Sequence, residues 1–209
     1  MRLGDHFQQI KKKYHNTFSS GICFDHRKIK KNYIFFAIKG NNLDGNNFIP
    51  SVIKKGCKII VTEKNFDEWK NGVLFINTKN IRKLLAQISF SIFKKKPNNL
   101  IAVTGTNGKS SVSDFYYQIL RLNNKKVASI GTLGVRSNNF NLNLFNTTID
   151  PIYLGKILNQ LKKRKIENVI MEASSHGLHQ NRLDGILFNS AIFTNLSQDH
   201  LDYHKNFKN

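Results

Sequence analysis

The segment IAVTGTNGKSSVSDFYYQIL, residues 101–120, contains a short apolar run, a break with glycines and serines, and then a second run with helical spacing. The first run, 100–104, is typical of a buried strand. In the second run, apolar side chains recur at positions 112, 115, 116 and 119, which predicts a helix. A strand, a glycine-containing loop and a helix in this order form a common phosphate-binding arrangement.

The loop itself reads GTNGKSS and spans residues 105–111. It departs from the strict pattern G-x-x-x-x-G-K-[ST], because Val103 stands where the first glycine would be. The chemistry is retained, since glycines let backbone N–H groups turn toward an anion, Lys109 can bridge phosphates and the Ser110 hydroxyl can ligate Mg²⁺. The alternative is a tight strand-to-helix turn with an exposed lysine. The flanking strand and helix favour a nucleotide.

Two further buried strands are predicted, at 168–174 and 190–196. Ligands of open α/β sheets gather at the carboxyl ends of the strands. Glu172 lies near the end of the first strand and His200 just past the end of the second, so we expect both to meet Ser110 in one crevice. The alternative for Glu172 is a pair with a surface lysine. A glutamate inside an apolar strand is costly to leave without a partner.

The histidines could also indicate a different metal. His200 and His204 are four residues apart, as in zinc-binding helices, but the glutamate of HExxH is absent because Leu201 follows His200. The pattern therefore disfavours zinc. We expect His176 and His179 to orient loops or substrate instead of binding metal.

The rest of the chain predicts the fold class. Apolar runs at 32–40, 57–63 and 72–78 are typical of strands, and they alternate with helical patterns near 46–56 and 81–88. A strand at 126–132 and a helix around 154–161 continue the alternation in the second half. We expect an α/β protein with a small N-terminal α/β domain, 1–96, and a P-loop domain, 97–209, with the boundary at the charged segment that contains Pro97.

Composition limits the partners. The chain has 209 residues, and 33 Lys and Arg against 13 Asp and Glu give a formal net charge of +20. This charge would suit nucleic acid, but the lysines are spread along the chain and no RNP-type or zinc-finger motif accompanies them, so we expect no specific nucleic-acid partner. No apolar run approaches the ~20 residues of a membrane span, and no signal peptide is recognisable. We expect a cytoplasmic protein without a membrane span, with Cys23 and Cys57 as reduced thiols.

Four motifs together are more specific than any one of them. VTGTNGKSS, NTT, MEASSHGLHQNR and FTNLSQDHLDYH, in this order and spacing, resemble the Mur ligases of peptidoglycan synthesis. SSHGL and DHLDYH favour the branch of that family that adds the third residue of the stem peptide. The segment FDHRKIKKNYIFFAIKGNNLDGNNFI resembles the family's N-terminal domain for the uridine nucleotide. The resemblance extends through nearly the whole chain.

The resemblance implies ATP-dependent amide formation. The γ-phosphate of ATP would pass to the D-Glu side-chain carboxylate of UDP-MurNAc-L-Ala-D-Glu, and the amine of a diamino acid would displace phosphate from the resulting acyl phosphate. The implied cofactors are ATP and Mg²⁺. Either meso-diaminopimelate or L-lysine could be the diamino acid.

The resemblance also implies roles for particular residues. The catalytic residues would be Lys109, Glu172 and His200, and the magnesium ligands would be Ser110, Glu172 and His200. The ATP phosphates would contact Gly105, Thr106, Asn107, Gly108, Lys109, Ser110 and Ser111. The acceptor peptide would contact Asn146, Thr147, Thr148, Ser174, Gln180 and Arg182. The uridine nucleotide would contact Phe24, His26, Asn41, Asn42 and Leu43.

The chain departs from the family pattern in several places. His26 stands where the family has the serine of DSR, NTTID replaces Asn-Thr-Thr-Pro-Asp, and an asparagine pair at 41–42 replaces the commoner His-Gln type. Family members continue past the equivalent of Asn209 with a carbamylated lysine and a C-terminal domain. We therefore expect an incomplete central domain that cannot ligate alone, with a missing C-terminal half as a partner. The alternatives are a ligation-dead module that binds UDP-sugar or ATP, another Mur-family ligase, and a basic nucleic-acid-binding protein on a ligase scaffold.

Overall fold

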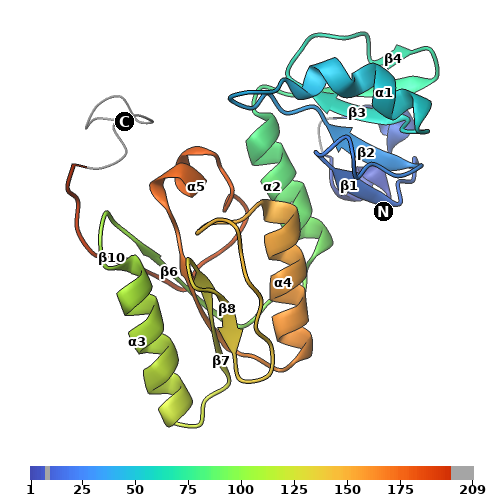
Figure 1. The fold of residues 1–209 in the computed structure, drawn as a ribbon. Helices are drawn as coiled ribbons and strands as arrows, with labels where there is room; N and C mark the ends of the chain where they lie inside the picture. The colour runs from blue at the N-terminus through green and yellow to red at the C-terminus, as the bar shows by residue number, and fades with distance from the viewer. Residues whose placement is uncertain (8–9, 199–209) are drawn as a thin grey trace. The chain divides into compact units, whose positions relative to one another are not determined.

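Strands and helices alternate through most of the chain in the computed structural model, which describes residues 1–7 and 10–198 (Figure 1). The chain divides into two compact units, Met1–Ile92 and Phe93–Asn209. Each unit contains a five-stranded sheet that is mostly parallel. The α/β fold class is confirmed, whereas the assignment of domains to residues 1–96 and 97–209 stays a prediction.

The sheet of the first unit has the strand order β1-β2-β3-β5-β4. Its strands are β1 (Gly21–Cys23), β2 (Tyr33–Phe36), β3 (Ile59–Thr62), β4 (Trp69–Lys70) and β5 (Val73–Asn77). Only β4 pairs antiparallel among these strands. Helix α1 (Ile49–Lys54) connects β2 to β3, and α2 (Ile81–Ile92) follows β5. Short 3-10 turns span Leu3–Asp5, Lys12–Tyr14 and Gly45–Phe48.

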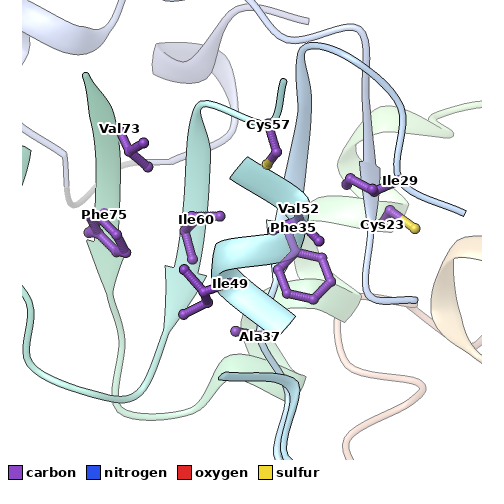
Figure 2. Close-up of a cluster of buried hydrophobic side chains, with 10 residues drawn as sticks. All are labelled: Cys23, Ile29, Phe35, Ala37, Ile49, Val52, Cys57, Ile60, Val73 and Phe75. Carbon is purple, nitrogen blue, oxygen red and sulfur yellow. The ribbon is translucent and has the colours of Figure 1, made fainter. Parts of the chain in front are cut away.

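Figure 2 shows the apolar cluster that joins this sheet to α1. Phe35 of β2, Ile60 of β3 and Val52 of α1 are fully buried. Val52 lies three residues after Ile49, so both point from the same face of the helix. The helical stripe predicted from the sequence therefore does form the contact between α1 and the strands. Phe75 of β5 completes the cluster on the far side of β3.

The sheet of the second unit has the order β10-β6-β9-β7-β8. Its strands are β6 (Asn99–Thr104), β7 (Val127–Gly131), β8 (Gly134–Ser137), β9 (Asn168–Glu172) and β10 (Ser190–Phe193). Its helices are α3 (Lys109–Leu122), α4 (Pro151–Lys163) and the short α5 (Ser175–His179). Helices α3 and α4 lie on opposite faces of this sheet (Figure 1).

The central strand of this sheet is β9, and its position determines what meets Glu172. β6 pairs with one side of β9 and β7 with the other, both in parallel. The carboxyl ends of the three strands therefore lie side by side. The glycine-containing loop at 105–111, which we call the P-loop and whose last residues begin α3, follows β6. Glu172 ends β9, and a two-residue turn at Thr132 follows β7.

Three features of the second unit differ from the sequence-based expectation. The predicted strand at 190–196 forms as β10, but the expectation that it is buried is wrong, because it lies at the sheet edge and Phe193 is 64% exposed. The strand β8 was not predicted at all, since its four residues follow β7 in a tight hairpin. Helix α3 begins as expected, yet its apolar residues Phe115 and Ile119 are exposed.

Two expectations from composition can also be compared with the structure. Cys23 and Cys57 are both buried and form no disulfide in the part of the chain that the structure describes, and burial raises the pKa of the Cys57 thiol. Nowhere in residues 1–7 and 10–198 does a helix have the length and apolarity needed to cross a membrane.

The substitution Phe35→Ala tests the cluster in Figure 2. Because Phe35 is fully buried, we expect it to lower the free energy of unfolding of the first unit by about 3–5 kcal/mol. Urea denaturation followed by circular dichroism measures the change. Phe18→Ala serves as the matched control, because Phe18 is 71% exposed and its loss should change stability by less than about 0.5 kcal/mol. Equal effects of the two substitutions would contradict the packing described here.

Candidate functional site

The P-loop connects β6 to the first residue of α3. Gly108 is the N-cap of α3 and has a left-handed backbone, with φ of 84°, which glycine adopts without steric cost. No side chain caps this helix end. The first-turn N–H groups of α3 have no acceptor within the helix, and the helix dipole adds partial positive charge there. The end of α3 is therefore suited to an anion.

The segment after β10 holds the first half of the P-loop in place. The N–H of Thr106 donates to the Asn195 carbonyl at 2.9 Å, and the N–H of Asn107 donates to the Asn195 side-chain oxygen at 3.0 Å. The Thr194 hydroxyl donates to the Asn107 carbonyl at 2.7 Å. A Cβ at Gly105 would lie 2.1 Å from the Thr194 hydroxyl oxygen, so only glycine allows this approach. Thr106 and Asn107 thus use their N–H groups in this contact, whereas the N–H groups at the start of α3 face no acceptor within the helix.

Lys109 lies folded across the loop. Its ammonium group donates to the carbonyls of Gly105 at 2.6 Å and Thr106 at 2.8 Å. These carbonyls hold the charge next to the start of α3. A bound phosphate would take over one or both of these hydrogen bonds, since a phosphate oxygen is a stronger acceptor than a carbonyl.

Glu172 is the buried carboxylate of the site, with 2% of its surface exposed. The Ser110 hydroxyl donates to Oε2 at 3.0 Å. Thr132 donates twice, from its N–H to Oε1 at 3.0 Å and from its hydroxyl to Oε2 at 3.0 Å. Within the part of the chain that the structure describes, no lysine or arginine pairs with this carboxylate. The described residues therefore do not form the alternative arrangement in which Glu172 pairs with a surface lysine.

Gly131 makes room for the Glu172 carboxylate. A Cβ at Gly131 would lie 2.2 Å from Oε1 and 2.4 Å from the carboxyl carbon of Glu172. A larger residue at position 131 would overlap the Glu172 side chain and force one of the two strands to shift. Gly131, the last residue of β7, thus leaves the space that the Glu172 carboxylate of the neighbouring strand occupies.

The oxygens of Ser110 and Glu172 fit a magnesium ion. A hydroxyl and a carboxylate are hard oxygen ligands, and Mg²⁺ binds six of these at about 2.1 Å in an octahedron whose edges are roughly 3 Å. The Ser110 hydroxyl oxygen and Glu172 Oε2 lie 3.0 Å apart, which matches one such edge. The third predicted ligand, His200, lies outside the described residues. Among those residues, no group of three or more His, Cys, Asp or Glu side chains forms a metal cluster by itself.

The residues predicted for the acceptor peptide lie beside Glu172. The Thr148 hydroxyl donates to the Glu172 carbonyl at 3.0 Å and accepts from the Ser174 N–H at 2.9 Å. The hydroxyls of Thr147 and Thr132 lie 3.0 Å apart. Arg182 donates to the Thr148 carbonyl and to the Gln180 side chain. Arg182 thus holds this cluster together, while Asn146 is exposed at its edge.

The residues predicted for the uridine nucleotide lie in the first unit, after the carboxyl ends of β1 and β2. Phe24 directly follows β1 and is 39% exposed. The His26 ring stacks on Phe48, with centroids 3.7 Å apart and an interplanar angle of 1°. The turn at 41–43 is exposed and is closed by the Gly40 N–H, which donates to the Leu43 carbonyl at 2.8 Å. The aromatic stack occupies the position where the sequence departs from DSR.

Asp25 lies between two of these residues. Arg27 donates to both carboxylate oxygens of Asp25 at 2.9 Å. These hydrogen bonds lower the pKa of the Asp25 carboxyl from 3.8 to about 2. The segment from Phe24 to Arg27 is therefore held as a turn by a bidentate ion pair.

Comparison with known proteins gives the family. The Mur ligase middle domain matches residues 103–209, just over half of the chain, and the Mur ligase family catalytic domain matches residues 19–91. The chain belongs to the Mur ligase family. The matched ranges contain both groups of residues described above.

Individual Mur ligases are similar over most of the chain. The UDP-N-acetylmuramoyl-L-alanyl-D-glutamate--2,6-diaminopimelate ligase of Rickettsia felis is 43% identical over 203 residues, which cover 93% of this chain and 37% of that protein. The ligase of the same name from Wigglesworthia glossinidia brevipalpis is 44% identical over 197 residues, covering 90% and 39%. A solved structure of a ligase of this name has a TM-score of 0.83 and 27% identity, and matches 100% of this chain and 43% of its own. The chain thus spans well under half the length of these relatives.

The Mur ligase from Thermotoga maritima described as MurF in complex with ADP shares the fold, with a TM-score of 0.55 and 19% identity over 88% of this chain. This similarity agrees with a mixed α/β arrangement for both units.

Sequence reasoning missed several residues of this site. Thr132 ends the predicted strand at 126–132, and the rule that ligands gather at carboxyl strand ends could have selected it, because β7 neighbours β9. Thr194 and Asn195 were quoted in the family motif, yet no role followed from their pattern. Their contact with the P-loop depends on β10 pairing with β6, which the sequence does not indicate.

The close contact at Gly131 predicts a coupling between two positions. Gly131→Ala should destabilise the chain by about 1–3 kcal/mol, because its Cβ overlaps the Glu172 carboxylate. In a Glu172→Ala background the overlapping atoms are gone, so the same substitution should cost less. Chemical denaturation of the four variants of this double-mutant cycle measures the coupling. Additive effects would show that the two residues do not constrain each other.

The Asp25–Arg27 pair predicts a pH dependence. The folded pKa of Asp25 lies below its usual value, so its contribution to stability is present above about pH 4 and is lost as the pH falls toward about 2. The unfolding midpoint in urea should therefore fall less between pH 4 and pH 2.5 in Asp25→Asn than in the unmodified chain. Arg27→Ala should give the same flattened profile, because it removes the cause of the shift. If the urea midpoints of the unmodified chain, Asp25→Asn and Arg27→Ala fall equally over this pH range, the Asp25–Arg27 pair does not stabilise the fold.

Proposed function

We propose that this chain forms the nucleotide- and acceptor-binding part of an ATP-dependent ligase that joins 2,6-diaminopimelate to UDP-MurNAc-L-Ala-D-Glu. The names of the relatives from Rickettsia felis and Wigglesworthia glossinidia brevipalpis support this activity and favour diaminopimelate over L-lysine. Because the chain spans 37% to 41% of the length of four relatives of this name from Rickettsia species, the activity of the whole relatives is carried over as a proposal.

One observation carries the proposal. Ser110 at the start of α3 and Glu172 at the end of β9 approach to 3.0 Å, with Lys109 on the same loop. A lysine, a hydroxyl and a buried carboxylate at adjacent strand ends match what a bound nucleoside triphosphate with Mg²⁺ requires. A simple strand-to-helix turn needs none of the three.

The proposed chemistry activates a carboxylate. The D-Glu side-chain carboxylate attacks the γ-phosphorus of ATP, the bond to the β,γ-bridging oxygen breaks, and ADP leaves. The amine of the diamino acid then attacks the acyl carbon, loses a proton, and inorganic phosphate departs as the amide forms. Catalysis of such transfers is mostly alignment and charge neutralisation.

The described residues have separate tasks in this reaction. Lys109 would leave the loop carbonyls and contact the transferred phosphoryl group. Ser110 and Glu172 would hold Mg²⁺, which offsets the negative charge of the triphosphate. Thr147 and Arg182 lie on the acceptor side, next to the carboxyl end of β9, where the D-Glu carboxylate must reach the phosphate. His200 would add a metal ligand by resemblance.

The acceptor's nucleotide would bind the first unit at Phe24, His26 and the turn at 41–43. The His26–Phe48 stack offers an aromatic surface there, although the family serine is absent. We also propose a cytoplasmic location, because the reaction consumes ATP.

Lys109→Ala tests the nucleotide site. Loss of a charged hydrogen-bond donor should weaken ATP binding in the presence of Mg²⁺ by roughly ten- to a hundredfold. Isothermal titration calorimetry with the non-hydrolysable analogue AMP-PNP measures it. Lys125→Ala is the matched control, because Lys125 is exposed and lies beyond the other end of α3.

Lys109→Ala also distinguishes the ATP site from the site for the UDP-linked acceptor. UDP-MurNAc-L-Ala-D-Glu should bind Lys109→Ala and the unmodified chain equally well. No detectable AMP-PNP binding to the unmodified chain would refute the nucleotide site, and equal loss of both ligands in Lys109→Ala would mean that the lysine is structural.

A complementation assay distinguishes a ligase part from a ligation-dead binding module. The portion of the Rickettsia felis relative that this chain does not cover would be supplied as a separate polypeptide with ATP, Mg²⁺, acceptor and diaminopimelate. Formation of UDP-MurNAc-tripeptide supports the ligase. Binding of both nucleotides without product under these conditions supports the binding module.

A further inference from the structure

We infer that Thr132 is a positioning residue that fixes the Glu172 carboxylate for the magnesium ion and links it to the acceptor side of the site. The inference rests on the proposed function, since it concerns the same nucleotide site. Nothing in the sequence motifs assigns Thr132 a role.

Thr132 owes its position to the β7–β8 hairpin. Gly131 pairs with Gly134, so Thr132 and Leu133 form a two-residue turn at the carboxyl end of β7. Gly134 has φ of 86°, and a Cβ there would lie 2.4 Å from the Leu142 carbonyl oxygen. Gly131 and Gly134, on either side of the turn, are therefore both in close contacts that only glycine allows. In this turn the backbone N–H and the hydroxyl of Thr132 both reach the Glu172 carboxylate.

The two Thr132 hydrogen bonds hold both oxygens of Glu172. The N–H reaches Oε1 and the hydroxyl reaches Oε2, each at 3.0 Å. A carboxylate that accepts a hydrogen bond at each oxygen cannot rotate about its terminal torsion without losing one of them. When Ser110 turns its oxygen toward a cation, the Thr132 bonds remain. Oε2 then stays beside Ser110 with its remaining lone pair available for the ion.

The protons of the hydroxyl groups give this network a direction. The Thr132 hydroxyl has one proton, and it is used toward Glu172 Oε2, because an ionised carboxylate only accepts. The 3.0 Å contact between Thr132 and Thr147 must then carry the proton of Thr147. The chain of donors runs from Thr147 to Thr132 to Glu172. An acceptor ligand that engages Thr147 is therefore connected to the metal carboxylate through one side chain.

This arrangement predicts that Thr132 matters for the effect of Mg²⁺ more than for the nucleotide itself. The phosphates would contact the P-loop, and no hydrogen bond described above joins Thr132 to that loop. Thr132→Val keeps the shape and the N–H bond but removes the hydroxyl. Thr132→Ser keeps the hydroxyl.

The test measures the dissociation constant of AMP-PNP with 5 mM EDTA and with excess Mg²⁺ for the 209-residue chain and its variants, by isothermal titration calorimetry. The ratio of the two constants reports the Mg²⁺ effect. We expect Thr132→Val to reduce this ratio roughly tenfold, as for the loss of a hydrogen bond to a charged group. Thr132→Ser should restore it, and the constant in EDTA should stay unchanged in both variants.

The outcomes separate the inference from the function on which it rests. An unmodified chain that does not bind AMP-PNP, or binds it equally with and without Mg²⁺, overturns the proposed function and the inference with it. A Mg²⁺ effect that persists in Thr132→Val overturns the inference alone. Thr132→Ala, which adds no methyl group near the carboxylate, guards against misfolding of the valine variant. Equal losses in EDTA and in Mg²⁺ for both Thr132→Val and Thr132→Ala would make Thr132 structural and also overturn the inference.

Discussion

The burial of one carboxylate is the constraint on which the second unit depends. A carboxylate as buried as that of Glu172 is expensive unless donors surround it, and Ser110 and Thr132 supply three hydrogen bonds from neutral donor groups. Those donors come from the strand ends on either side of β9. The order of the sheet, the hairpin after β7 and the glycine at 131 can all be understood as conditions for that one environment.

A second constraint acts on the P-loop. Three backbone groups of Thr106 and Asn107 are held by Thr194 and Asn195, so the loop's shape depends on a segment about 90 residues away in sequence. The pairing of β10 with β6 delivers that segment. The loop is therefore ordered before any ligand arrives, and the donors at the start of α3 are already oriented.

The sequence predicted the long elements and the chemistry-bearing residues better than the contacts among them. The strands around Ile34, Ile60 and Leu100 and the helices α1, α2 and α4 follow from apolar periodicity, because each buries a regular face. Helix α3 also forms where its periodicity predicts a helix, but its apolar stripe is exposed. The strand β8 and the edge position of β10 could not be predicted, since hairpin closure and strand order depend on partners distant in sequence. Lys109, Ser110 and Glu172 were selected by residue type and strand ends. Thr132 was missed because a threonine in a turn has no distinctive pattern, and the role of His200 stays a prediction.

The exposed edge of the second sheet has a consequence for handling the chain in solution. In the described residues, the outer backbone groups of β10 face no further strand, and Phe193 beside them is mostly exposed. On α3, Phe115, Ile119 and Leu122 add an apolar stripe at spacings of four and three. Unpaired strand edges and apolar stripes promote self-association that grows with concentration. Purification of this chain is thus a matter of avoiding self-association as well as of folding, and dilute samples are the natural starting condition.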